Sequence, residues 1–264
     1  MSPGTSQRWR HPGLTGAAVY AVAAAVVGGI ITVVSRLQVA KQRGRRRVAR
    51  SLPDGGVIII SNHTSYVDGI LLALVCRKLG RSVRLLATSG IFRAPGLGSL
   101  ARRLGFIRVD RGESTAAHAL DAAAEALAAG EAVGIFPEGR LTRDPDHWPE
   151  RAKTGTVRLG LRTGAPIVPV AMVGAHRVLG KRHIFSTLVS NVLLRPRVLT
   201  AVGDPIDVRS MVDRWDEPDA EQVRLATDRV MERLIDLVEE LRGEIAPNPA
   251  GVARTTDSPG ATVG

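Results

Sequence analysis

The residues with the clearest capacity for chemistry are His63 and Asp68, which stand five positions apart in the segment N-H-T-S-Y-V-D at residues 62–68. An imidazole can remove a proton from a hydroxyl group. A carboxylate beside it can fix the ring tautomer and stabilise the imidazolium that forms. The same residues also fit a structural role, in which His63 caps a helix and Asp68 interacts with the helix dipole. The pair alone does not decide between the two interpretations.

Two elements must position this pair. Residues 57–60 form a β-branched run, V-I-I-I, which predicts a short buried strand. Residues 66–79 carry apolar side chains three and four positions apart and predict a helix. His63 therefore falls in a strand-to-helix turn. Asp68 falls in the first helical turn, from which its carboxylate can fold back toward the ring.

Three further blocks follow along the chain. Residues 105–111 read G-F-I-R-V-D-R, residues 134–140 read G-I-F-P-E-G-R, and residues 165–171 read A-P-I-V-P-V-A. The last block is expected to be a strand interrupted by two prolines. Together with N-H-x4-D, these blocks resemble, in this order, the PlsC-like lysophospholipid acyltransferases, the family of 1-acylglycerol-3-phosphate acyltransferase. The resemblance spans residues 57–174, and four blocks in order are far more specific than any one of them.

The resemblance implies a reaction for the histidine pair. It makes His63 the general base and Asp68 its orienting partner, so that a substrate hydroxyl attacks an acyl thioester directly. Ser65 is an alternative nucleophile, but it lies too near His63 in sequence for an easy triad, and the chain has no G-x-S-x-G elbow. The implied reaction needs no cofactor. It transfers a fatty acyl group from acyl-CoA or an acyl carrier protein to lysophosphatidic acid, giving phosphatidic acid.

The resemblance also implies a site for the acceptor phosphate. Arg111 matches the phosphate-contacting arginine of the family, and a guanidinium can bind phosphate oxygens bidentately. Gly139 lets backbone N–H groups approach an anion, because no Cβ intervenes. Glu138 either holds an arginine in place or bonds an acceptor hydroxyl. Asn62, which opens the N-H-x4-D block, is placed in the same substrate-binding set.

The chain departs from the family after F-P-E-G, where a small hydroxyl residue and then an arginine are usual. Here Arg140 follows at once, and L-T leads to Arg143. Arg140 is the preferred phosphate ligand because it follows the turn glycine directly, and Arg143 is the alternative. Lys153 resembles a basic residue that the family places ahead of a glycine, here Gly155, and joins the predicted site. Arg108 is interpreted as a solvated strand arginine.

Other functions remain as alternatives. Within the family, the acceptor could be another lysophospholipid or an amino-lipid. From other classes, the chain could be a lipid-binding protein without turnover, or a thioesterase or lipid hydrolase that uses water. No metal site is expected, because the other histidines lack ligand spacing. Cys76 is the only cysteine, so no intrachain disulfide can form, and it is interpreted as a small core residue.

The basic charge of the chain is concentrated near its N-terminus. The formal net charge is +11, and residues 1–50 contain nine Lys and Arg and no acid, which leaves 27 bases and 25 acids in the remainder. Such a distribution gives no basic footprint across the fold. We therefore expect no nucleic-acid partner.

Residues 14–34 form an uncharged run that is long enough to cross a hydrocarbon core of about 30 Å as a helix. A secretory signal and an interfacial helix are the competing interpretations. The run is long for the first and lacks the polar face of the second. The seven bases from Arg36 to Arg50 mark the cytoplasmic side and attract anionic membrane lipids. We therefore predict a membrane anchor at residues 14–35, with the catalytic domain facing the cytoplasm.

The remaining segments predict one α/β domain. A tail at residues 1–13, the anchor and a basic connector at residues 36–55 precede it. Strand-like and helix-like segments then alternate through residues 56–245, which indicates a mixed, largely parallel sheet flanked by helices. Residues 246–264 are rich in Pro, Gly, Ser and Thr and predict a disordered tail. Further strands are expected at residues 83–87, 132–136, 167–173 and 198–202, and further helices at 97–104, 113–129, 154–163 and 219–243.

Overall fold

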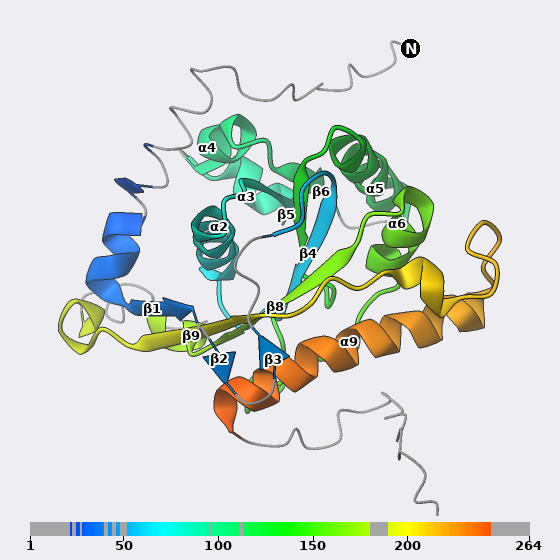
Figure 1. The fold of residues 1–264 in the computed structure, drawn as a ribbon. Helices are drawn as coiled ribbons and strands as arrows, with labels where there is room; N and C mark the ends of the chain where they lie inside the picture. The colour runs from blue at the N-terminus through cyan, green and yellow to red at the C-terminus, as the bar shows by residue number, and fades with distance from the viewer. Residues whose placement is uncertain are drawn as a thin grey trace, which may run out of the picture.

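The structure is a computed structural model, and it describes residues 22, 25–26, 28–39, 42–43, 46–47, 52–95, 97–110, 113–179 and 190–243. Figure 1 shows a central sheet with helices on both faces. This confirms the predicted α/β fold with a mixed, largely parallel sheet. The predicted tails at residues 1–13 and 246–264 lie outside the described residues, as does half of the predicted anchor at residues 14–35.

Seven strands form the main sheet, in the order β1-β9-β8-β4-β7-β5-β6. Every neighbouring pair is parallel except β8 and β9. Two short strands, β2 (Gln42–Arg43) and β3 (Arg46–Arg47), pair separately. The strands of the main sheet are β1 (Arg36–Val39), β4 (Val57–Ser61), β5 (Val83–Thr88), β6 (Ile107–Val109), β7 (Ala132–Ile135), β8 (Ile167–Val173) and β9 (Arg197–Val202).

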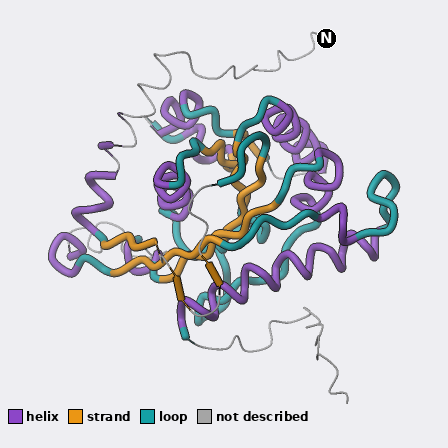
Figure 2. The backbone as a smooth tube through the Cα atoms, in the orientation of Figure 1, coloured by secondary structure: helices purple, strands orange, loops and turns teal. Residues whose placement is uncertain are grey.

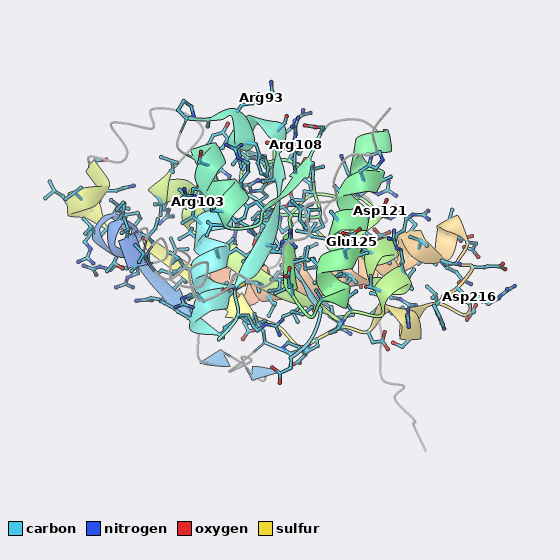
Figure 3. All side chains as sticks on the ribbon, turned by 90° about the horizontal axis from the view of Figure 1, so that it is seen from above. Arg93, Arg103, Arg108, Asp121, Glu125 and Asp216 are labelled. Carbon is cyan, nitrogen blue, oxygen red and sulfur yellow. The ribbon has the colours of Figure 1, made fainter. Side chains whose placement is uncertain are left out.

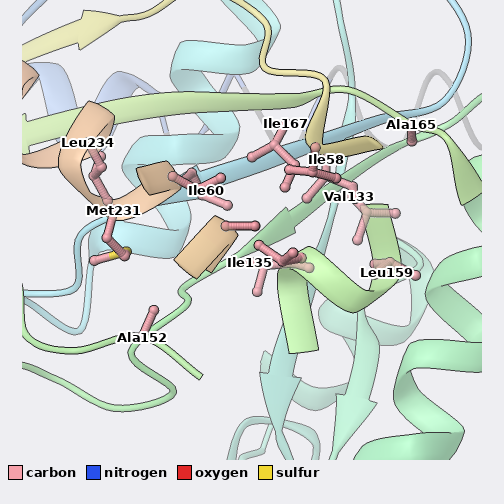
Figure 4. Close-up of a cluster of buried hydrophobic side chains, with 14 of the residues drawn as sticks. Ile58, Ile60, Val133, Ile135, Ala152, Leu159, Ala165, Ile167, Met231 and Leu234 are labelled. Carbon is pink, nitrogen blue, oxygen red and sulfur yellow. The ribbon is translucent and has the colours of Figure 1, made fainter. Parts of the chain in front are cut away.

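The central strand β4 shows why the V-I-I-I run predicts a strand buried on both sides. All five of its residues are buried. Ile58 and Ile60 face one apolar cluster, which Figure 4 shows in close-up, while Val57 and Ile59 face the other. A parallel strand covered by helices on both faces has no polar side, which explains the absence of alternation in its sequence.

Helices cover the two faces of the sheet. The helix α2 and the N-terminal helical segment (described residues 22, 25–26 and 28–34) pack on one face, and α5, α6 and α9 pack on the other. Figure 2 shows α9 as one long helix beside the sheet. The helices are α2 (Asp68–Lys78), α3 (Ser89–Arg93), α4 (Leu97–Arg103), α5 (Glu113–Ala128), α6 (Gly155–Thr163), α7 (Ala175–Val178), the 3₁₀ helix η1 (Val208–Met211) and α9 (Ala220–Arg242).

One element differs from the sequence predictions. Part of the predicted connector at residues 36–55 is the edge strand β1, which pairs in parallel with β9, so the basic segment begins inside the sheet. The strand predicted at residues 167–173 is confirmed, because β8 runs from Ile167 to Val173 in spite of the proline inside it. Pro169 removes one N–H donor from the strand, but its carbonyl still accepts a hydrogen bond of 2.8 Å from the N–H of Gly203.

The N-terminal helical segment has one buried side and one exposed apolar side. Ile31 and Val34 are buried against the domain, whereas Val22, Val26, Ile30 and Val33 are exposed. Arg195 holds the segment by donating a hydrogen bond to the carbonyl of Thr32. Within the described part of the chain, we find no helix with both the length and the apolar character needed to span a bilayer.

Candidate active site

The candidate site lies where the neighbouring strands β4 and β7 end. The helix α2 connects β4 to β5 over one face of the sheet, whereas the connection from β7 to β8 runs through α6 on the other face. The connections that leave β4 and β7 therefore run in opposite directions along the sheet and over opposite faces, which makes this pair a topological switch point. In open α/β sheets, ligands bind beyond the carboxyl ends of the strands at such a point. His63 follows β4 and Phe136 follows β7, and their rings stack with centroids 4.1 Å apart.

His63 and Asp68 form the contact that their spacing predicts. Nδ1 of His63 lies 3.0 Å from Oδ2 of Asp68. The same oxygen accepts hydrogen bonds from the backbone N–H groups of Thr64 and Ser65, at 2.6 and 2.7 Å. Burial raises the pKa of Asp68 above its ordinary value, and the hydrogen bonds from His63, Ser65 and Thr64 partly offset that effect. Because Nδ1 faces the carboxylate, Nε2 is the nitrogen left to exchange a proton with a substrate.

Glu138 holds the backbone around His63. One carboxylate oxygen accepts a hydrogen bond of 3.1 Å from the N–H of His63, and the other accepts one of 3.2 Å from the N–H of Glu150. Only 4% of the residue is exposed. Burial raises the pKa of Glu138 to about 8, and the nearby carboxylates of Glu150 and Asp68 contribute. In the described contacts, each oxygen accepts from a backbone N–H group. The two predicted roles of Glu138, holding an arginine and bonding the acceptor hydroxyl, stay predictions.

The loop at residues 141–151 holds His63 from the other side. The N–H of Thr142 donates a hydrogen bond of 2.7 Å to the carbonyl of His63. The hydroxyl of Thr142 donates to the carbonyl of Trp148 at 2.7 Å and accepts from the N–H of Asp144 at 3.2 Å. Both backbone groups of His63 are therefore fixed by the segment that follows β7.

Arg140, the preferred phosphate ligand, forms an ion pair within this loop. Its two terminal nitrogens lie 3.1 and 3.2 Å from the two carboxylate oxygens of Glu150. One of those oxygens also accepts a hydrogen bond from the N–H of Arg143. The Arg140 side chain is 44% exposed, so it remains accessible to an anion. An incoming phosphate would compete with Glu150 for this guanidinium.

Gly139 and Lys153 lie against each other at the turn after β7. Gly139 has a φ of +70°, which favours glycine. A Cβ at this position would lie 3.2 Å from Cε and 3.3 Å from Nζ of Lys153. Both residues are exposed. The predicted site residues Gly139, Arg140 and Lys153 are thus brought together as a cationic surface beside the glycine turn.

Asn62 and Ser65 are committed to the scaffold. The side-chain amide of Asn62 donates to the carbonyl of Met172 and accepts from its N–H, both at 2.8 Å. These two hydrogen bonds connect the turn to β8, and Asn62 is buried. Its predicted contact with substrate stays a prediction. Ser65 is also buried, and its hydroxyl donates to the carbonyl of Leu179. Arg111 lies outside the described residues.

The model of the family described as Acyltransferase matches residues 37–173, just over half of the chain. The chain belongs to the acyltransferase family. The matched range contains every residue of the site described above, including His63, Asp68 and the turn at Gly139. Acyltransferase chemistry explains why an imidazole oriented by a carboxylate lies beside a cationic turn.

This acyltransferase is similar to several known proteins. It is 31% identical over 135 residues to an uncharacterised protein of Mycobacterium tuberculosis, which covers 47% of this chain and 35% of that protein. The chain thus spans about a third of the length of that relative. It is 26% identical over 188 residues to 1-acyl-sn-glycerol-3-phosphate acyltransferase of Bacillus subtilis, covering 71% and 84% of the two chains. The crystal structure of the acyltransferase PlsC of Thermotoga maritima superposes with a TM-score of 0.62 at 20% identity, covering 92% and 87%.

Three contacts of the acyltransferase site were not predicted from the sequence. Phe136 stacks on His63, Thr142 fixes the carbonyl of His63, and Glu150 pairs with Arg140. The position of Phe136 at the end of the strand predicted at residues 132–136 was the available signal for the first of these contacts. The other two depend on how the loop folds. Among the described residues, no group of three or more His, Cys, Asp and Glu side chains could hold a metal ion.

Proposed function

We propose that this protein transfers a fatty acyl group from an acyl thioester to the free hydroxyl of lysophosphatidic acid, giving phosphatidic acid. The observation that carries the proposal is the His63–Asp68 pair, held at 3.0 Å beside an exposed cationic turn. The Bacillus subtilis relative is named for this activity, as is a relative from Borreliella burgdorferi.

The proposed reaction uses His63 twice. Nε2 removes the proton of the acceptor hydroxyl while the hydroxyl oxygen bonds to the thioester carbon. The C–S bond then breaks, and the imidazolium returns the proton to the departing sulfur. The products are an ester and a free thiol, so no acyl-enzyme is required. The negative charge of Asp68 stabilises the imidazolium between the two proton transfers.

The exposed cations explain how a phosphate-bearing acceptor would be held. Lys153 and Arg140 flank the turn at Gly139, directly after the strand whose end stacks on His63. In lysophosphatidic acid only a few bonds separate the free hydroxyl from the phosphate. A phosphate near this turn therefore leaves the hydroxyl within reach of the imidazole. We include Arg111 in the proposed site on the family pattern alone.

The donor is proposed to be acyl-CoA or acyl-acyl carrier protein, with no cofactor. The deciding experiment measures thioester consumption by the purified protein with and without lysophosphatidic acid, and identifies the lipid products by mass spectrometry across a panel of lysolipids. Consumption that requires lysophosphatidic acid and yields phosphatidic acid supports the proposal. Consumption without acceptor would indicate a thioesterase, and lipid binding without consumption would indicate a binding protein.

We further propose that the protein works at a membrane, attached through the apolar segment at residues 14–35, with its catalytic domain on the cytoplasmic side. The support is the exposed apolar side of the N-terminal helical segment, formed by Val22, Val26, Ile30 and Val33. The seven bases from Arg36 to Arg50 follow it and suit an anionic lipid surface.

A further inference from the structure

A second basic region lies within the domain. The net charge of residues 51–264 does not reveal it, because 27 bases and 25 acids nearly cancel. Between Asp68 and Asp110 the chain has eight Lys and Arg and no acid. Some of these bases are structural: the guanidinium of Arg81 binds backbone carbonyls, and Arg84 pairs with Glu131 at 2.9 Å. The remainder include the exposed arginines of α3, α4 and β6, namely Arg93, Arg102, Arg103 and Arg108.

Two of these arginines meet in one polar cluster at the ends of β5 and β6. Arg93 donates a hydrogen bond of 2.8 Å to the hydroxyl of Ser89. Arg108 pairs with Asp110 through two contacts, at 2.9 and 3.2 Å. Hydrogen bonds from Ser89 and Arg108 lower the pKa of Asp110, and the charge of Arg93 contributes. Asp110 can neutralise one of the two guanidinium groups, so the cluster keeps a positive charge.

The cluster lies on the same edge of the sheet as His63 but some distance along it. Figure 3 shows Arg93 and Arg108 over the part of the molecule formed by α3, α4 and β6, whereas Asp121 and Glu125 lie over α5. In the strand order, β6 is three positions from β4. At about 4.8 Å per strand, the two strand ends are roughly 14 Å apart.

This separation identifies the part of the substrates that could reach the cluster. The acceptor phosphate is only a few bonds from the reacting hydroxyl, so it cannot span the distance. In the donor, a pantetheine arm joins the thioester to a phosphate. That arm has as many main-chain bonds as about four extended residues, or roughly 14 Å. With the thioester at His63, the donor phosphate is therefore within reach of Arg93 and Arg108.

We propose that Arg93 and Arg108 bind the phosphate of the donor's phosphopantetheine arm, which acyl-CoA and acyl-acyl carrier protein share. The proposal rests on the proposed function for its second substrate. In this proposal, the donor phosphate binds at the ends of β5 and β6, and the acceptor phosphate binds at the turn at Gly139.

The test compares Arg93→Gln, Arg108→Gln and the double variant with the full-length wild type. Three donors with the same acyl chain are used: acyl-CoA, acyl-acyl carrier protein, and S-acyl-pantetheine, which has no phosphate. We expect the double variant to raise the KM for both phosphate-bearing donors by about tenfold. The KM for lysophosphatidic acid should change far less. Arg162→Gln is the matched control, because Arg162 is an exposed arginine paired with Asp121 on the other face.

Direct CoA binding, measured by calorimetry, separates this inference from the proposed function. If the wild type turns over no donor but CoA binding still requires the two arginines, the proposed function fails and the inference stands. An equal loss with S-acyl-pantetheine would overturn the inference, as would a rise confined to the KM for lysophosphatidic acid or a loss with only one of the two phosphate-bearing donors. Unchanged donor kinetics with weaker binding to anionic vesicles would assign the cluster to membrane lipid instead.

Discussion

At the scale of single residues, His63 is fixed by three polar contacts and one ring contact. Asp68 holds the ring nitrogen Nδ1, Glu138 accepts from the backbone N–H, and Thr142 donates to the backbone carbonyl. The ring also stacks on Phe136. A general base must keep its geometry while the substrate changes, and these contacts remove most of the freedom of the side chain and its backbone.

The first prediction concerns the proton transfer. His63→Ala should lower kcat by at least about a hundredfold, the effect typical of losing a general base. Asp68→Asn should lower kcat by at least a similar factor, because the ring loses the charge that selects its tautomer. Steady-state kinetics of folded variants provide the measurement. The control is His118→Ala, which removes an exposed histidine on α5. Near-normal turnover in a folded His63→Ala protein would end the proposed mechanism.

The second prediction concerns the buried carboxyl of Glu138, whose pKa is raised from an ordinary value near 4.3 to about 8. Between these values the unfolded chain has lost the proton and the folded chain keeps it. The free energy of unfolding should therefore fall as pH rises through this range, by at most about 1.4 kcal/mol per pH unit, and level off above pH 8.

The Glu138→Gln variant has no ionisable group at this position. Its free energy of unfolding should therefore not show the decrease with pH that Glu138 causes. Denaturant unfolding of both proteins at several pH values between 5 and 9 gives the comparison. As pH rises, the free energy of unfolding of the wild type should decrease relative to that of the variant. A difference that stays constant across the range would show that Glu138 keeps its charge when buried.

At the scale of elements, local contacts could be predicted and those between distant segments could not. The contact between His63 and Asp68 spans five residues across a strand-to-helix turn, so spacing alone predicts it. The contacts of Glu138 and Thr142 with His63 require β7 to lie beside β4. The seven strands of the main sheet could be arranged in many orders with the same alternation of elements, and the sequence does not indicate that β7 lies between β4 and β5.

The same reasoning explains the predictions that differ from the structure. A basic, partly exposed segment such as Arg36–Val39 resembles a connector, because only its partner β9 makes it a strand. Pro169 lies inside a strand that was predicted correctly, and the strand tolerates it because the proline carbonyl still accepts a hydrogen bond from Gly203. The pairing of Asn62 with Met172 could not be predicted, because the two residues lie far apart in the sequence.

The third prediction concerns the loop at residues 141–151. Thr142→Val keeps the shape of the buried side chain but removes the hydroxyl that holds the loop at Trp148 and Asp144. We expect kcat to fall several-fold with little change in either KM, because the loop then holds the carbonyl of His63 less firmly. Thr142→Ser should restore turnover.

A matched control separates this effect from a general loss of stability. Thr227 is also buried, and its hydroxyl donates to the carbonyl of Val223 within α9. Thr227→Val should lower the unfolding free energy by a similar amount, about 1 kcal/mol, without changing kcat. Equal kinetics for the two valine variants would show that Thr142 has no positioning role.

At the scale of the whole molecule, charge and apolar surface are distributed unevenly. Basic residues gather at positions 36–50 and again between Asp68 and Asp110, whereas residues 112–264 contain more acids than bases. The N-terminal helical segment adds an apolar surface whose inner side, Ile31 and Val34, is part of the core. Removal of the whole segment would therefore change the packing of the core, and an experiment could not separate loss of membrane attachment from loss of stability. Substitutions on its outer side avoid that problem.

The last prediction therefore replaces two exposed side chains, Ile30 and Val33, with glutamate in the full-length protein. These residues are 52% and 51% exposed, so the domain should remain folded. Attachment by the charged segments alone should fail in high salt, because the Debye length shrinks from about 10 Å at 0.1 M to about 3 Å at 1 M. We expect the wild type to stay with vesicles at 1 M salt and the double variant to be released. Leu225→Glu, at a 50% exposed apolar residue of α9, is the matched control and should remain bound. Retention of the double variant would place the membrane contact elsewhere on the molecule, and release of the wild type by salt would leave electrostatic attraction as its only attachment.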